Sequence, residues 1–229
     1  MAIQDSKINN LNEAFEIILD AIVTQELAPG EKVSENIFNE RFGISRTISR
    51  NLIERLTTKY FLTNVSQRVT QVSSLTLLDI KQNFMLRKLL IPDAFALASS
   101  NINIEQLTTL HEQIDKLLPI ADDESALKLL KVNKEVNLAI ISATGYPLML
   151  DLAEQLENMA MRIYWLYIKT NQRYPYSPEQ QTKMFEFLKN NDPVTIKSMA
   201  NEMLTQTEER IINAVFSNKQ FCNQNLLTE

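Results

Sequence analysis

The chain has 229 residues, of which 45% are hydrophobic and 22% are charged, and its formal net charge is −5. These values are typical of a globular protein with one large domain or two smaller ones. They exclude a bilayer-spanning protein, because no apolar run approaches the roughly 18 residues that a transmembrane helix needs. The single cysteine, Cys222, allows neither an internal disulfide nor a cysteine metal cluster. We therefore expect a protein of the reducing cytoplasm that has no membrane partner.

Residues 1–73 show the element order of a winged helix-turn-helix domain. Ser34 is a candidate N-cap for the second helix, Gly43 lets the chain turn after it, and Ser45 is a candidate N-cap for the third helix. The segment YFLTNVSQRVTQV is β-branched and alternating, which predicts a two-stranded hairpin. The predicted elements are helices at 8–26, 34–42 and 45–58 and a hairpin at 60–72.

Residues 74–229 show helical periodicity without strand patterns, which predicts an all-helical second domain. The short segments NIN, ADDES, GYP, RYPYSP and NNDP separate its helices. The fold class is therefore mainly α, with an N-terminal winged helix-turn-helix followed by an all-α six-helix bundle. The predicted helices lie at 76–99, 103–119, 122–143, 147–171, 178–190 and 193–217.

The predicted helix at 147–171 carries more apolar side chains than one side of a bundle needs, which favours a dimer. The apolar positions are Leu148, Leu152, Leu156, Met159, Ile163 and Leu166. Asp151, Glu154 and Glu157 drift around the same helix, and we interpret them as solvated surface. The sequence leaves open which helices form the dimer interface.

The three glycines of the chain exclude the usual phosphate-cradling loops. Gly30, Gly43 and Gly145 are too far apart to form a GxGxxG motif or a P-loop. Enzyme chemistry of other kinds has little support either. The lone histidine, His111, lies in a helical segment without a recognisable nucleophile motif, and such a histidine is more often a surface or packing residue than a base. We predict no catalytic residue, and a helical enzyme is a remote alternative.

The stretch GISRTISRNLIERL at residues 43–56 separates an apolar face from a basic one. At about 100° per residue, Ile44, Leu52 and Leu56 fall on one side of a helix, while Arg46 and Arg50 point to the other. Residues 41–68 have a net charge of +5, so the rest of the chain carries −10. A basic segment in an acidic protein is typical of a face that meets phosphates. A solvated charged face is the alternative that charge alone leaves open.

The segments ELAPGEKVSE and FGISRTISRNLIERL, with a hairpin and six helices after them, resemble the GntR family of bacterial transcription regulators. The helical half resembles the FadR-type (FCD) effector domain in its VanR-like six-helix form. The resemblance implies a sequence-specific regulator, with repression favoured, that binds an inverted-repeat operator in double-stranded DNA as a homodimer. It also implies a small-molecule effector, often an organic acid, in the helical domain. A helical domain that only dimerises, without an effector, is the alternative.

The resemblance assigns DNA contacts to the start of the third helix and to the hairpin. Arginine suits this place because its planar fork can pair with guanine O6 and N7 or hold a phosphate. The sequence has Ile48 where relatives have a proline, and Gln67 with Arg68 where the hairpin tip often has a glycine, which leaves minor-groove contact open. The predicted contacts are Asn36, where many relatives carry arginine, and Ser45, Arg46, Thr47, Arg50 and Arg68.

Many FadR-type domains hold a divalent metal through an aspartate and three histidines. The resemblance maps these positions onto Asn133, Asn137, Gln181 and Met203. Neutral amides and a thioether bind transition metals poorly, so we predict no metal and no cofactor. We expect a metal-free effector pocket lined by these four residues, with Arg87 and Arg162 able to pair with an acidic group on the ligand.

Overall fold

The computed structural model describes residue 8 and residues 10–217, so Cys222 lies outside the described residues. The chain divides into two compact units, Met1–Leu75 and Thr76–Glu229. The division falls close to the domain boundary predicted after residue 73. Each unit has its own core.

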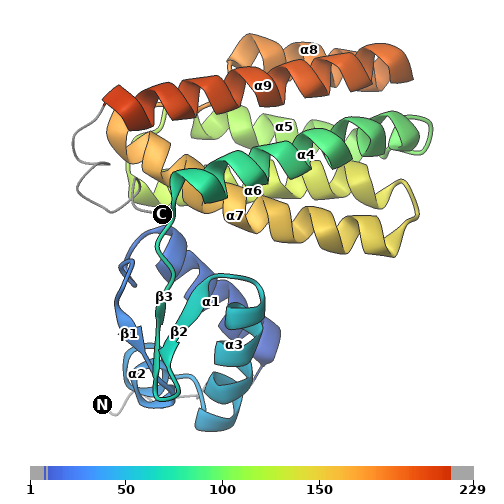
Figure 1. Cartoon of the computed structure of the whole chain (residues 1–229). Helices are drawn as coiled ribbons and strands as arrows, with labels where there is room; N and C mark the ends of the chain where they lie inside the picture. Colours follow the sequence, from blue (N-terminus) through green and yellow to red (C-terminus); the bar gives the residue numbers. More distant parts are fainter. Residues whose placement is uncertain (1–7, 9, 218–229) are drawn as a thin grey trace, which may run out of the picture. The chain divides into compact units, whose positions relative to one another are not determined.

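The N-terminal unit is a winged helix-turn-helix (Figure 1). Its antiparallel sheet has the order β1-β3-β2, with Lys32 opposite Gln71 and Leu62 opposite Val72. The predicted hairpin is confirmed as β2 and β3, and the structure adds β1 as a third strand. The elements are α1 Leu11–Val23, β1 Lys32–Val33, α2 Glu35–Phe42, α3 Arg46–Thr58, β2 Leu62–Ser66 and β3 Val69–Val72.

Capping and amphipathic patterning explain these elements. The Asn10 side chain accepts hydrogen bonds from the first turn of α1, so this helix begins later than the predicted residue 8. The Ser34 hydroxyl accepts from the Ile37 amide at 3.3 Å, which confirms it as the N-cap of α2. The three helices bury their apolar faces against each other and against the sheet. The core includes Phe15, Ile18, Leu19, Ile22, Phe38, Leu52, Leu56 and Phe61.

The second unit contains the six predicted helices, and no strand occurs in its described part. The Thr76 hydroxyl and the Asp79 carboxylate form a capping box at the start of α4, and Asp122 and Ser125 do the same for α6. Pro147 begins α7. The helices are α4 Leu77–Ala98, α5 Ile104–Leu117, α6 Asp123–Ser142, α7 Pro147–Asn171, α8 Pro178–Asn190 and α9 Pro193–Ser217.

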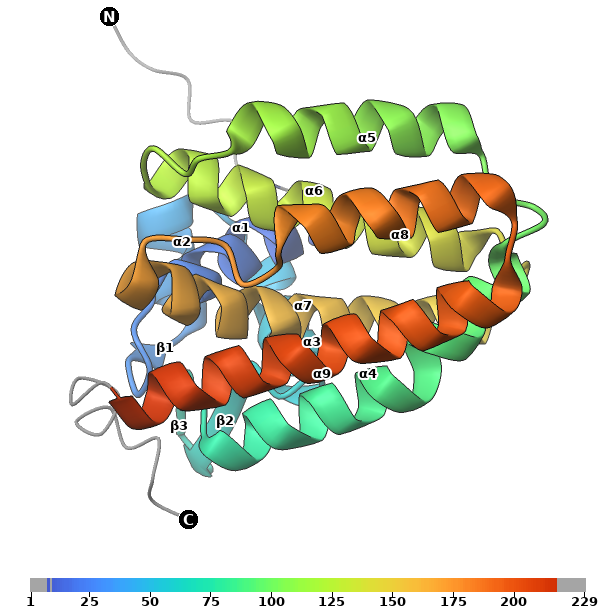
Figure 2. The ribbon, with the colours of Figure 1, turned by 90° about the horizontal axis from the view of Figure 1, so that it is seen from above.

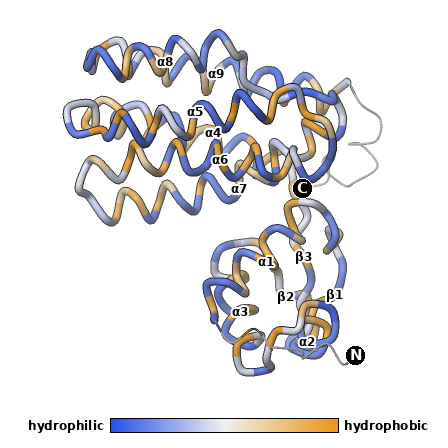
Figure 3. The backbone as a smooth tube through the Cα atoms, turned by 180° about the vertical axis from the view of Figure 1, so that it is seen from behind, coloured by the Kyte–Doolittle hydropathy of each residue, from blue (hydrophilic) through white to orange (hydrophobic). Residues whose placement is uncertain are grey.

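In the helical unit, α4 packs along α9 on one side and α7 on the other, and α6 packs between α5 and α7 (Figures 1 and 2). The helix α8 packs against α9. Figure 3 shows hydrophobic and hydrophilic stretches alternating along the helices, as amphipathic helices require. Within the described residues, no helix combines the length and the apolar character that crossing a membrane requires.

Candidate DNA-binding surface and effector cavity

The turn between α2 and α3 sets the direction of α3. Gly43 has a φ of +66°, in the left-handed region that favours glycine, and its amide donates to carbonyl oxygens at the end of α2. The Asn39 side chain donates to the Ile44 carbonyl at 2.9 Å. Ser45 occupies the predicted N-cap position of α3, but its hydroxyl makes no capping hydrogen bond with the described residues. The turn is therefore held by α2 and leaves the Ser45 hydroxyl available.

The outward face of α3 carries Arg46, Thr47 and Arg50, which are all exposed, while Leu52 and Leu56 on the opposite face are fully buried. Neither arginine side chain forms an ion pair or a hydrogen bond with another residue in the described part of the chain. Two guanidinium groups on the first turns of one helix are thus free to meet a partner outside this chain.

Two other basic residues of the segment at 41–68 have structural partners. Arg41 forms an ion pair with Glu31. The Arg55 guanidinium lies 4.2 Å from the centre of the Phe15 ring and donates to Asn12 Oδ1 at 2.8 Å, which ties α3 to α1. These two arginines could not be distinguished from Arg46 and Arg50 by sequence alone, because their partners lie in other parts of the chain.

The remaining predicted DNA contacts are also exposed. Asn36 lies in the first turn of α2, and Arg68 lies in the turn between β2 and β3, where its backbone amide donates to Ser66 Oγ at 3.3 Å. Their side chains form no hydrogen bond with any residue that the structure describes. The structure thus places all six predicted contacts in one unit, on α2, the start of α3 and the hairpin turn.

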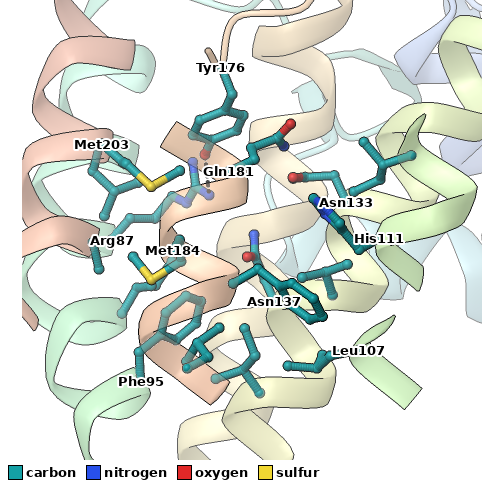
Figure 4. Close-up of a pocket in the computed structure, with 18 residues that line it drawn as sticks. Arg87, Phe95, Leu107, His111, Asn133, Asn137, Tyr176, Gln181, Met184 and Met203 are labelled. Atoms are coloured by element: carbon teal, nitrogen blue, oxygen red, sulfur yellow. Dashed lines mark hydrogen bonds between the residues drawn. The ribbon is translucent and has the colours of Figure 1, made fainter. Parts of the chain in front are cut away.

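The helical unit contains a cavity with a volume of about 80 Å³. Its lining comes from α4, α5, α6, α8 and α9, with Tyr176 added from the segment before α8 (Figure 4). Five of the six predicted pocket residues line it, namely Arg87, Asn133, Asn137, Gln181 and Met203. The fold therefore brings together positions that are more than a hundred residues apart in the sequence. Their role in binding an effector stays a prediction.

Arg87, one of the lining residues of this cavity, belongs to a buried ion pair. Arg87 Nη2 donates to Glu157 Oε1 at 2.8 Å, and each side chain is only 1% exposed. Asn137 Nδ2 donates to the other carboxylate oxygen at 3.1 Å. Arg87 also donates to the Tyr164 hydroxyl and, at 3.4 Å, to the Tyr176 hydroxyl. The Glu157 carboxylate and the Arg87 guanidinium are thus both engaged within the protein.

The charged state of this pair follows from the balance of burial and attraction. Burial opposes the charge of Arg87, but the Glu157 carboxylate and the two tyrosine hydroxyls offset it and hold the Arg87 pKa well above its usual value. Burial raises the pKa of the Tyr164 hydroxyl, so this group stays neutral. The positive charge of Arg87 is therefore balanced inside the fold, and the prediction that it is free to pair with an acidic ligand is corrected.

Two further expectations differ from the structure. Glu157, interpreted as solvated, is buried, and its position on the same face of α7 as Ala153 and Tyr164 is the signal that could have revealed this. Arg162 lies outside the lining of the cavity. It is 4% exposed, and burial lowers its pKa to about 10 against the opposing attraction of Asp79. Arg162 therefore cannot meet a ligand in this cavity.

The donor groups of the cavity do not fit a transition metal. Asn133, Asn137 and Gln181 offer neutral amides, and the Asn137 amide already donates to Glu157. His111 lines the cavity, but its ring is stacked on Phe185 with centroids 4.9 Å apart. Among the residues that the structure describes, no three His, Cys, Asp or Glu side chains come together as a metal site.

Residues 82–206 match the FCD domain family, and this match covers more than half of the chain. The chain therefore belongs to the FCD-domain group of GntR-family transcription regulators, as the sequence predicted. This family consists of transcription factors, which agrees with the prediction that the chain is not an enzyme.

Solved structures share the fold over nearly the whole chain. McbR/YncC from E. coli has a TM-score of 0.75 and 19% sequence identity, and the match covers 90% of this chain and 99% of that one. A GntR transcriptional regulator from Rhodococcus sp. RHA1 has a TM-score of 0.71 and 14% identity, with 89% and 98% covered. A GntR-family regulator from Pseudomonas syringae pv. tomato has a TM-score of 0.53 and 17% identity, with 93% and 92% covered. No curated protein matches the sequence. At these identities the similarity establishes the fold.

Proposed function

We propose that this regulator binds an inverted-repeat operator as a homodimer, and that a small molecule in the cavity of the helical unit changes its affinity for the operator. The observation that carries the proposal is the pair of unpartnered arginines on the outward face of α3. The protein acts in the cytoplasm, and its binding to the operator represses transcription.

The position of Arg46, Thr47 and Arg50 supports reading of base edges. A recognition helix enters the major groove with its first turns against the bases, and these residues occupy the first two turns of α3. An arginine fork can pair with guanine O6 and N7, and the Thr47 hydroxyl can donate to or accept from a base. We propose phosphate contacts for Arg68 and Asn36, which lie on the hairpin turn and on α2.

Substitution of either arginine by alanine tests operator recognition. The operator is first selected from random DNA by the full-length protein. We then expect Arg46→Ala and Arg50→Ala each to weaken operator binding by about 1–3 kcal/mol, because each removes a base contact. Fluorescence anisotropy with operator and random duplexes measures the change. Arg173→Ala, which removes an exposed arginine of the helical unit, is the matched control.

Equal discrimination between operator and random DNA by the wild-type protein and both α3 variants would contradict this proposal. A loss that also occurs in the Arg173→Ala control would indicate a general effect of charge and not base recognition.

Exposed apolar side chains on α4 and α7 support the homodimer. Leu89 on α4 is 66% exposed, and Leu148 on α7 is 72% exposed. Met85, Leu86 and Leu152 are also exposed on these two neighbouring helices. The predicted apolar surface of the helix at 147–171 is thus restricted to its first part. Of the other predicted positions, Ile163 is buried, and Leu156, Met159 and Leu166 are half-buried.

Charges introduced on this surface should dissociate the dimer. We expect Leu86→Glu combined with Leu89→Glu to raise the dimer dissociation constant by at least about 100-fold, since facing like charges in an interface cost several kcal/mol. Sedimentation velocity over a concentration series measures the constant. Val194→Glu, at an exposed position of α9, is the control. A dimer that tolerates the double substitution would place the interface on other helices, and a wild-type monomer would contradict the homodimer.

A further inference from the structure

We infer that the cavity binds a neutral and mainly apolar molecule carrying one group that both donates and accepts hydrogen bonds, such as a carboxamide, and that it does so without a metal ion. The inference rests on the proposed function in one respect, since it takes this cavity as the effector site.

The charge balance of the cavity wall excludes an anion. Arg87 and His111 are the basic residues among the described lining residues. The positive charge of Arg87 is already matched by Glu157 at 2.8 Å, behind the cavity surface. A carboxylate entering this space would lose its hydration without meeting an unpaired positive charge, and it would lie close to a buried carboxylate. A neutral ligand avoids both costs.

Hydrogen-bonding groups without partners show where a ligand would be held. The Asn133 residue is 7% exposed, and neither its side chain nor that of Gln181 forms a hydrogen bond within the described part of the chain. These amides face the cavity without a protein partner, so a bound molecule can supply the missing hydrogen bonds.

The chemistry of these groups favours a ligand that both donates and accepts. Each side-chain amide carries an NH₂ donor and a carbonyl acceptor. A carboxamide can accept from the NH₂ group of Asn133 or Gln181 and donate its own NH₂ group to an amide carbonyl oxygen. A carboxylate can only accept, so it leaves the amide carbonyl oxygens without a donor.

The rest of the cavity accommodates an apolar body. In Figure 4 Tyr176, Gln181 and Asn133 gather toward one end of the cavity, and Phe95 and Leu107 lie toward the other. The cavity volume of about 80 Å³ is about half of the roughly 150 Å³ that holds a benzene ring, so the wall has to move for a ligand of that size. Met184 and Met203 also line the wall, and these unbranched side chains can adjust to a larger one.

Matched pairs of carboxamides and carboxylates test the inference with the full-length protein. The probes are butanamide and butanoate, hexanamide and hexanoate, and benzamide and benzoate, measured by isothermal titration in a buffer that contains a chelator. We expect the best carboxamide to bind at least about tenfold more tightly than its carboxylate, a difference of about 1.4 kcal/mol. Adding Mn²⁺ or Zn²⁺ without chelator should not increase the affinity for any carboxylate.

Two substitutions locate the selectivity. Glu157→Gln removes the charge that balances Arg87, so we expect the affinity for benzoate to rise at least about tenfold and the preference to reverse. Asn133→Leu removes a hydrogen-bonding partner and should weaken benzamide binding by about fivefold, close to the net contribution of one hydrogen bond. Gln113→Met, on α5 but outside the cavity lining, should change neither affinity.

The inference would be overturned if the wild-type protein preferred carboxylates, if a metal ion were needed for binding, or if no member of either series bound. Operator binding measured with the same samples is a separate result. Loss of the Arg46 and Arg50 effects on operator selection would contradict the proposed function, whereas ligand preferences test only this inference.

Discussion

Arg87→Met is expected to lower the free energy of unfolding of the helical unit by about 3–5 kcal/mol, because it leaves a buried carboxylate without its counter-charge. Glu157 is 1% exposed and would keep only Asn137 as a hydrogen-bond donor. The double variant Arg87→Met/Glu157→Leu should recover most of this loss, since apolar side chains can replace a buried ion pair. Urea unfolding followed by the fluorescence of Trp165, the single tryptophan of the chain, reports on this unit.

The neighbouring residue Lys88 provides the control for this prediction. Lys88 pairs with Glu208 at 2.7 Å, but this pair is partly exposed, so Lys88→Met should cost no more than about 1 kcal/mol. A double variant as unstable as Arg87→Met alone would show that the loss comes from packing around Arg87. The ion pair would then not be the cause.

Phe38→Ala is expected to unfold the N-terminal unit while the helical unit stays folded. The Phe38 side chain is fully buried in a unit that spans only Met1–Leu75. Loss of a buried phenylalanine side chain costs about 3–5 kcal/mol, and a core of this size rarely supplies more than about 3–5 kcal/mol. Operator binding should therefore be lost, and circular dichroism should show less helix at room temperature.

The fluorescence of Trp165 distinguishes the two units in this experiment. Its unfolding transition should be unchanged in Phe38→Ala, because Trp165 lies in α7 of the helical unit. Phe216→Ala, at an exposed position of α9, serves as the control and should leave both operator binding and circular dichroism unchanged. A Trp165 transition that moves with Phe38→Ala would show that the units do not unfold independently.

The helices could be predicted from the sequence because their ends carry local signals. Ser34, Thr76 and Asp122 cap the helices that follow them, and Gly43 ends α2 in the left-handed conformation. These signals act over a few residues, and a sequence displays them directly. Strand β1 was not predicted because Lys32 and Val33 are too few to show alternation, and only the pairing with β3 makes them a strand.

The state of the buried charges could not be predicted in the same way. Arg87 and Glu157 are paired across 70 residues of sequence, and nothing near either residue indicates the other. Periodicity alone predicts the helices that carry the cavity residues. Only the family resemblance indicates that these residues lie together in one pocket. The same holds for the arginines of α3. Arg55 differs from Arg46 and Arg50 only because it contacts Phe15 and Asn12 of α1.

The turn at Gly43 limits which changes in chain length this protein can accept. The connection between α2 and α3 is short and fixed. Gly43 ends α2, the Asn39 side chain donates to the Ile44 carbonyl, and the Ile44 side chain is fully buried. One residue inserted after Arg50 would rotate Arg46 and Arg50 by about 100° relative to Leu52 and Leu56. The arginines would then leave the outward face, although every side chain would still be present. Homologues that recognise DNA in the same way should therefore vary in residue type between 39 and 56 but not in spacing, while the exposed segment before α6 should accept insertions.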